Sequence, residues 1–311
     1  MYRRVAREGA SAVTLPTLED LLSLRGAAQG LRLQSRRPTH TVHSGGHRSS
    51  HRGRGLEFQE VRPYVSGDDP RTIDWRVTAR RGKPHTKLFR EERERPVWLL
   101  ADLNASMFFG TRRQLKSTVV VRAGALLAWS AALAGDRVGA VVAGASGCRI
   151  LPPRSREAGV LPVLGALLEL QPKAPGAATD GLAVGLRSLA PLIHPGSLVL
   201  ALSDFASLDG AHDTAQWAGL AVHNEFRLLW VTDPLEKQAL PNGRFRIGVP
   251  GRSVSVDGAA IRGAWVEKWR AREARIQQLA REINASVTEL DTSEPVEVVL
   301  RTLLSGRRTA A

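Results

Sequence analysis

The stretch VWLLADLNAS at residues 97–106 decides the fold of this chain. Its first five residues are apolar, as is typical of a strand that a parallel sheet buries on both faces. Polar residues then follow at alternate positions, beginning with Asp102. The stretch SLVLALSD at residues 197–204 has the same form and ends in Asp204. The sequence therefore predicts two buried strands that each run directly into an acid.

From residue 96 onward, apolar runs alternate with helical patterns. Further strands are predicted at 137–143, 149–151, 226–231 and 287–290, and helices at 111–135, 158–170, 182–189, 214–222, 259–284 and 295–304. Strands and helices that alternate in this way indicate crossover units and a mostly parallel sheet. We therefore predict an α/β, Rossmann-like fold with flanking helices, which a small β excursion near 242–257 interrupts.

The region before this alternation has a different character. A short helix is predicted over Thr14–Leu33, and a Gly/Ser/His/Arg-rich loop over Arg36–Arg54. We predict two domains: an N-terminal basic extension at 1–95, and the α/β domain at 96–311.

Composition excludes several classes of protein. One cysteine, Cys148, rules out an internal disulfide framework and a cysteine-rich zinc module. The chain has no apolar run of about 18 residues and no signal-peptide pattern at its start, so we expect a cytoplasmic protein without a membrane segment. Four histidines stand in the Gly/Ser/Arg loop, at His40, His43, His47 and His51. We interpret them as part of a solvated loop, with a metal site as the weaker alternative.

The net charge of +14 is concentrated in residues 32–95, which hold 16 basic and 8 acidic residues. Only six of the 44 basic residues are lysine, and an arginine bias of this kind is as typical of genome composition as of recognition. Nucleic-acid binding through 32–95 is the alternative that this charge leaves open. Four aromatic residues lie among these arginines, and we expect three of them to be structural: Phe58, Tyr64, Trp75 and Phe89.

In open parallel sheets, ligands bind at the carboxyl ends of the strands. Oxygens of Asp102, Asn104 and Ser106 can converge there if the chain stays extended, and Thr179 can add a hydroxyl from the loop before a helix. Mg²⁺ prefers such a set of oxygen ligands together with retained waters. The alternative is that the acids cap the helices that follow them.

The Asp-x-Asn-x-Ser run, the Thr179 loop and Ser203-Asp204 resemble the metal-ion-dependent adhesion site of a von Willebrand factor A domain. Asn104 stands where that family has a serine. The resemblance implies that Mg²⁺ or another divalent cation is held by Asp102, Asn104, Ser106, Thr179 and Asp204. It further implies that an acidic side chain of a client protein fills an open coordination position.

A second group of residues lies upstream, in the motifs GRGLEF at 53–58, EVRPY at 60–64 and GDDPRTIDW at 67–75. These motifs resemble the signature of the bacterial domain-of-unknown-function family fifty-eight. Its members carry a von Willebrand A-like domain and are usually encoded beside MoxR-type AAA+ ATPases, so the resemblance implies such an ATPase as a partner. The signature residues are Arg54, Glu57, Glu60, Arg62, Asp68, Asp69, Arg71, Asp74, Trp75 and Arg80.

Physically, this signature is typical of a structural turn. Asp68 and Asp69 can accept backbone N–H groups and cap a helix predicted over Arg71–Arg81, and the arginines and acids can pair in a bidentate network. We expect Trp75 to give that helix its packing face. The alternative is a surface that binds a partner.

The sequence lacks the phosphate-binding glycine loops, the zinc-protease motif and the nucleophile elbow, so it predicts no catalytic residues. An aspartyl phosphatase of the haloacid dehalogenase type needs a second acid where Asn104 stands. We therefore predict a non-enzymatic adaptor with a metal-dependent site, which works with a MoxR-type ATPase in protein assembly or maturation. Nucleic-acid binding is the first alternative and a metal-dependent hydrolase the second.

Overall fold

The computed structural model describes residues 15–31, 33, 56–66, 68, 70–91, 94–176, 180–208, 211–249 and 252–304. It divides into two units. Residues 1–36 and 95–311 form the first, which we call the α/β body, and residues 37–94 form the second, which we call the signature unit.

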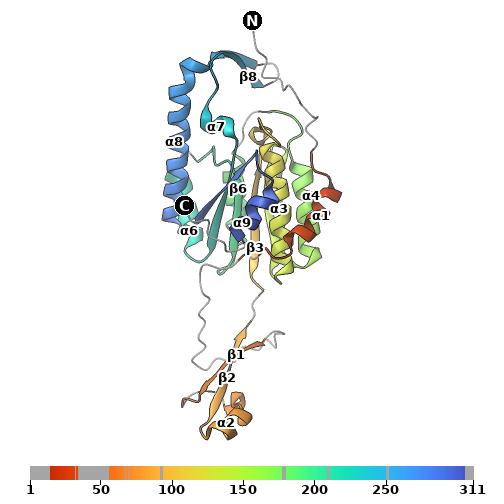
Figure 1. The fold of residues 1–311 in the computed structure, drawn as a ribbon, viewed down its shortest axis with the longest axis vertical. Coiled ribbons are helices and arrows are strands. Elements are labelled where there is room, and N and C mark those ends of the chain that lie inside the picture. The colour runs from red at the N-terminus through yellow and green to blue at the C-terminus, as the bar shows by residue number, and fades with distance from the viewer. Residues whose placement is uncertain are drawn as a thin grey trace. The chain divides into compact units, whose positions relative to one another are not determined.

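A six-stranded sheet lies at the centre of the α/β body (Figure 1). The strands follow the order β10-β7-β6-β3-β4-β5, and β5 alone runs antiparallel to its neighbour in this sheet. Their bounds are β3 Pro96–Leu103, β4 Arg137–Gly144, β5 Gly147–Ser155, β6 Leu198–Ser203, β7 Glu225–Thr232 and β10 Ser286–Asp291. The predicted α/β fold with a mostly parallel sheet is confirmed.

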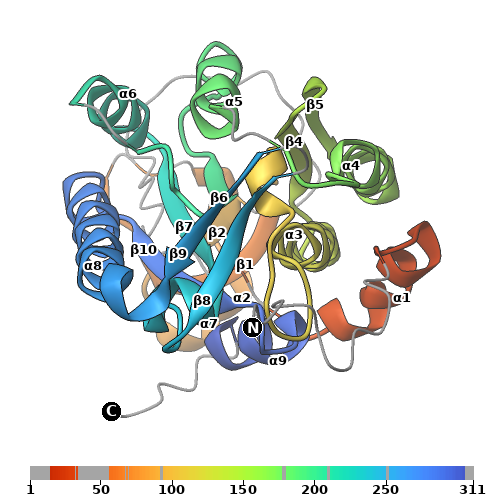
Figure 2. The same cartoon turned by 90° about the horizontal axis from the view of Figure 1, so that it is seen from above.

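Helices cover both faces of this sheet, as Figure 2 shows. One face packs against α1 Leu18–Ala28, α3 Lys116–Leu133, α4 Glu157–Leu170 and α9 Val296–Leu304. The other packs against α5 Gly181–Leu189, α6 Ala211–Ala221 and α8 Gly258–Glu282. Within β3, Leu99 belongs to the first core and Leu100 to the second, because successive side chains of a strand point to opposite faces. None of the helices in the described part of the chain combines the length and the apolar character needed to cross a bilayer.

The long charged helix α8 packs on the second face of the sheet, near β7 and β10. Trp269 stacks on Trp230 with ring centroids 4.8 Å apart, and Ile276, Leu279 and Ile283 are buried. The hairpin of β8 Arg244–Val249 and β9 Arg252–Asp257 precedes this helix, which confirms the predicted β excursion.

The N-terminal helix α1 belongs to the α/β body, although the predicted boundary at 95/96 assigned it to the extension. Leu21 and Leu24 of α1 are buried in the same core as α3. The indole nitrogen of Trp129 donates to the carbonyl of Leu21 at 3.1 Å, and Ser130 Oγ donates to the carbonyl of Leu31 at 3.0 Å. The chain therefore contributes to the body on both sides of the signature unit.

The signature unit is built on an antiparallel hairpin of β1 Leu56–Pro63 and β2 His85–Glu91. Between these strands lie a single 3₁₀ turn, η1 Pro70–Thr72, and the helix α2 Trp75–Arg81. Asp74 caps α2, since its Oδ1 accepts the backbone N–H groups of Arg76 and Val77 at 3.0 and 3.1 Å. The helix thus begins four residues later than predicted, because Asp74 supplies its cap.

The place of α1 in the body can be tested with two neighbouring leucines. Leu21 is fully buried whereas Leu22 is 40% exposed. We expect Leu21→Ala to lower the free energy of unfolding by about 2–5 kcal/mol, and Leu22→Ala by about 0.5 kcal/mol. Urea denaturation of the full chain measures both values. Equal, small losses for the two variants would contradict the assignment of α1 to the body.

Candidate functional site at the carboxyl edge of the sheet

The two predicted acid-ended strands, β3 and β6, lie side by side. They pair in parallel with Ala101 opposite Leu202, so the residues that follow each strand meet at one edge of the sheet. Ser203 Oγ donates to Asp102 Oδ2 at 2.8 Å. The structure therefore brings Asp102 and Asp204 together as the sequence predicted.

Asp102 is buried and accepts hydrogen bonds on both of its oxygens. Its Oδ1 accepts from the backbone N and from Nδ2 of Asn104 at 3.2 and 2.9 Å, while Ser203 occupies Oδ2. Burial, and then the nearby charge of Asp204, raise the pKa of Asp102 to about 6 against the effect of these bonds. A Cβ at Gly181 would lie 2.6 Å from Asp102 Oδ1. The backbone at the start of α5 thus packs directly against this carboxylate.

Asn104 and Ser106 form a local cap. Asn104 Oδ1 accepts from the backbone N and the Oγ of Ser106 at 2.8 and 2.7 Å, which caps the 3₁₀ turn η2 Ala105–Met107. Asp204 Oδ1 likewise accepts the backbone N–H of Ala206 at 3.0 Å. The alternative reading of these residues, that they cap the turns that follow, therefore describes their observed hydrogen bonds.

A buried lysine, which the sequence analysis did not select, lies against this edge. Lys116 Nζ donates to Asp204 Oδ2 at 2.6 Å and to Glu236 Oε1 at 3.1 Å. The side chains of Lys116 and Asp204 are only 3% and 4% exposed. Burial alone would lower the pKa of the Lys116 ammonium, but the charges of Asp204 and Glu236 raise it above its ordinary value. Burial would likewise raise the pKa of Asp204, yet Lys116 holds it below its ordinary value.

The ion pair extends into a chain of alternating charges. Arg272 on α8 donates to Glu236 Oε1 at 3.3 Å, and Glu236 lies on the short helix α7 Pro234–Gln238. The four groups Asp204, Lys116, Glu236 and Arg272 therefore connect the end of β6, the start of α3, α7 and α8. We call them the edge network. They carry two negative and two positive charges, which balance one another.

A sequence signal for Lys116 did exist. Lysine is rare in this arginine-rich chain, and Lys116 opens a helix whose next fifteen residues hold one other charged residue, Arg122. A charged residue in the first turn of an otherwise apolar helix is expected to pair with a buried group of opposite charge. Glu236 and Arg272 had no comparable signal, because they lie in ordinary polar surroundings.

Several predicted residues lie outside the described residues. These are Thr179, Arg54, Asp69, the side chains of Glu57 and Glu60, and the four histidines His40, His43, His47 and His51. Among the residues that the structure does describe, no group of three or more His, Cys, Asp or Glu side chains is arranged to hold a metal ion.

The described side chains at this edge do not fit the divalent cation that the resemblance implies. Asp204 already has a cationic partner in Lys116 at 2.6 Å. Asn104 directs its amide nitrogen, and not its oxygen, toward Asp102. Ser106 gives its hydroxyl hydrogen bond to Asn104. The four predicted oxygen ligands that the structure describes are thus engaged with one another, with Ser203 and with the lysine.

In the described part of the signature unit, Asp68 takes part in a predicted ion pair and in the predicted turn. Arg62 pairs with Asp68 at 2.7 Å, and Asp68 Oδ2 accepts the backbone N–H of Val65 at 3.0 Å. Trp75 differs from its predicted packing role, because its side chain is 69% exposed at the start of α2. The residue was correctly placed on a helix but not on the inward face of that helix.

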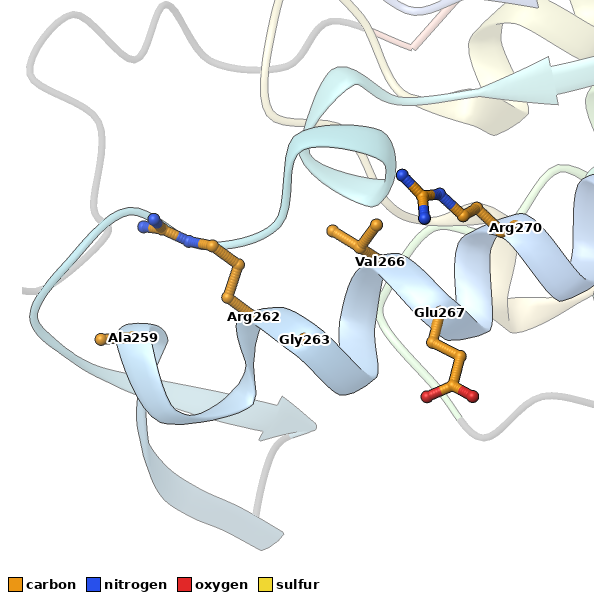
Figure 3. Close-up of a pocket in the computed structure, with 6 residues that line it drawn as sticks. All are labelled: Ala259, Arg262, Gly263, Val266, Glu267 and Arg270. Atoms are coloured by element: carbon orange, nitrogen blue, oxygen red, sulfur yellow. The ribbon is translucent and has the colours of Figure 1, made fainter.

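Two other features carry no comparable chemistry. A shallow hollow of about 740 Å³ runs along α8, between Arg262 and Arg270 (Figure 3). Arg262 is already bonded there to Asn242 Oδ1 at 2.8 Å. Cys148 is half-buried against the second core, with its Sγ 3.9 Å from Ser188 Oγ.

Another buried acid, Asp233, fixes the loop that leads into α3. Its carboxylate accepts from the backbone N and Oγ1 of Thr111 at 2.8 and 2.5 Å, from Thr292 Oγ1 at 2.6 Å and from the backbone N of Leu235 at 2.9 Å. Burial would raise the pKa of Asp233, but the hydrogen bonds from Thr111 and Thr292 hold it below its ordinary value. The ionised form therefore stabilises the folded chain.

The pH dependence of this contribution can be measured with Asp233→Asn. We expect the variant to lose roughly 1–3 kcal/mol of unfolding free energy at neutral pH. Because the pKa of Asp233 is lowered on folding from 3.8, its contribution is complete above that value and is lost as the pH falls through the folded pKa. Chemical denaturation from pH 7 to pH 3 should show the two proteins converging in acid. A constant difference across this range would contradict the assignment.

Comparison with known proteins places the chain in a family. A family model described as "Protein of unknown function DUF58" matches residues 60–275. Uncharacterized proteins of Mycobacterium tuberculosis and Mycobacterium bovis are each 28% identical over 293 residues, which covers 92% of this chain and 91% of theirs.

Two solved structures extend the comparison. The conserved hypothetical protein BatB from Bacteroides thetaiotaomicron is 13% identical with a TM-score of 0.44, over 67% of this chain and 97% of that one. The VWA domain of SpRpn10 is 11% identical with a TM-score of 0.37, over 68% and 95%. The family model spans more than half of the residues, and this chain therefore belongs to the DUF58 family of proteins of unknown function.

Proposed function

We propose that this protein is a cytoplasmic adaptor that binds a MoxR-type AAA+ ATPase through helix α2 of its signature unit. The observation that carries the proposal is the exposure of Trp75. A tryptophan side chain that is 69% exposed leaves a large apolar area in water, and surface patches of this kind mark interaction sites.

The residues around Trp75 suit a protein contact. Ala79 follows four residues later on the same exposed side of α2, and Arg76 and Arg80 form a second exposed pair beside it. Tryptophan and arginine are the residue types that contribute most to the binding energy of protein interfaces. The Arg62–Asp68 ion pair involves neither Arg76 nor Arg80, so it leaves these two charges available to a partner.

The charge of this surface favours an acidic partner. Residues 37–94 hold 13 basic and 8 acidic residues, and α2 with the turn after it contributes Arg76, Arg80, Arg81 and Lys83 without any acid. The resemblance of the signature to the family suggests the ATPase as that partner. The carboxyl edge of the sheet supports the proposal indirectly, because its acids are buried and paired within the chain.

The proposal can be tested by binding of the purified full chain to the MoxR-type ATPase of the same organism. We expect Trp75→Ala to weaken the affinity at least about tenfold, as the loss of a central aromatic contact does. We expect Arg76→Glu/Arg80→Glu to weaken it further, and most strongly at low salt. Biolayer interferometry gives both dissociation constants.

Matched controls are available on the α/β body. Val298→Ala removes an apolar side chain that is 56% exposed on α9, and Arg281→Glu reverses an exposed charge on α8. Both are expected to bind the ATPase like the unmodified chain. If the α2 variants bind the ATPase as tightly as the unmodified chain does, the proposal for this surface is contradicted. If the full chain does not bind the ATPase at all, the ATPase is excluded as the partner.

Nucleic-acid binding is the competing use of the same charges. Fluorescence anisotropy with duplex DNA at two salt concentrations distinguishes the two functions, because a nucleic-acid contact weakens steeply with salt. We expect no saturable DNA binding at either concentration. Salt-sensitive binding that Arg76→Glu/Arg80→Glu abolishes would favour the nucleic-acid function instead.

A further inference from the structure

We infer that the ammonium group of Lys116 takes the place of a divalent cation at the carboxyl edge of the sheet, so that this von Willebrand A-like body works without a metal ion. The inference rests on the edge network and is independent of the function proposed for α2. It changes the chemistry expected of the edge, because a locked internal ion pair offers no open coordination position to a client's carboxylate.

Lys116 and Asp204 are in direct contact. Lys116 Nζ and Asp204 Oδ2 are 2.6 Å apart, and both side chains are almost completely withdrawn from water. A buried ion pair with this geometry is retained because separating it leaves a bare charge in a low-dielectric interior. The oxygen of Asp204 that faces the edge is therefore already committed to a cation that the chain itself supplies.

The positive and negative charges of the edge network balance one another. Glu236 is the second acid on Lys116 Nζ, at 3.1 Å, and Arg272 is a second cation on Glu236, at 3.3 Å. These four groups are therefore neutral among themselves, and the neighbouring Asp102 carboxylate adds one negative charge when it is ionised. A divalent cation at Asp204 would bring two further positive charges against the Lys116 ammonium in a buried site, where like charges repel most strongly.

The surroundings of Asp102 leave little room for a metal ion at its Oδ1. Mg²⁺ requires near-octahedral oxygen ligands at about 2.0–2.1 Å. On one side of Asp102, Oδ1 faces the amide group of Asn104, whose Nδ2 is a hydrogen-bond donor and not a ligand. The backbone of Gly181 packs so closely against the same oxygen that even a Cβ there would lie 2.6 Å away. Donors and backbone thus occupy the directions from which Oδ1 would coordinate.

The direct test uses the unmodified full chain and the metal alone. Isothermal titration with MgCl₂ and with MnCl₂ is expected to give no saturable heat, and the thermal midpoint is expected to be the same in EDTA and in millimolar MgCl₂. Saturable binding of either ion that Asp204→Asn removes would overturn the inference.

A substitution of Lys116 provides the complementary test. In Lys116→Met the Asp204 carboxylate loses its nearest cation, and we expect the thermal midpoint in EDTA to fall by roughly 5–10 °C. Because the place of the ammonium is then vacant beside two acids, we expect MgCl₂ to restore part of that loss. Lys116→Met/Asp204→Asn removes the unpaired charge, and it should be more stable than the single variant and insensitive to MgCl₂.

Lys237→Met is the matched control. Lys237 lies on α7 next to Glu236, but its side chain is 34% exposed and its acidic partners Glu289 and Asp291 are partly in water. The midpoint of this variant should change little and should not respond to MgCl₂. A folded Lys116→Met chain that matches this control in both respects would contradict the role given to the ammonium. If Lys116→Met does not fold with or without MgCl₂, the titration of the unmodified chain decides the question.

Discussion

The buried pair of Lys116 and Asp204 is the interaction on which the carboxyl edge of this protein depends. Removing two charges from water is costly, and the cost is offset only when each group meets a partner at close range. The 2.6 Å contact meets that condition, and Glu236 adds a second acid to the same ammonium. Such a pair requires β6, α3 and α7 to arrive at one place together. The buried pair therefore fixes the positions of these three elements relative to one another at the carboxyl edge.

Around this pair, several other polar groups at the strand ends are also paired within the chain. Ser203 joins the end of β6 to Asp102 at the end of β3. Asp233, at the end of β7, binds the loop before α3 through Thr111, and it reaches the end of β10 through Thr292. The strand ends are thus joined in two neighbouring pairs, β3 with β6 and β7 with β10, by hydrogen bonds between short side chains, which lose little conformational entropy when they are fixed. An edge that is satisfied in this way has little need of an ion to hold its loops.

The sequence predicted the sheet well, because continuous apolar runs such as 97–101 are specific for buried parallel strands. It also placed Asp102 and Asp204 at one edge, since the order of strands and helices suffices for that. It did not predict that α1 packs on the α/β body, because the apolar face of a helix does not show which core that face will join. It could not predict Asp204 as the partner of Lys116 for a related reason: a pairing 88 residues apart in the sequence depends on tertiary contacts, which local patterns do not encode. The exposure of Trp75 was missed because a tryptophan in a basic segment fits a packing role and a binding role equally well.

The two units differ in how they use their charges, and this difference constrains where recognition occurs. In the α/β body, the acids of the strand ends are buried and each meets a donor from the chain itself. In the signature unit, Trp75 and the arginines of α2 face water. Binding energy comes from groups that change their surroundings when a partner arrives, so groups that are already desolvated and paired can add little. The function proposed for α2 and the inference about Lys116 are therefore consistent with each other: we propose that the body serves as the framework and that the signature unit carries the surface that a partner recognises.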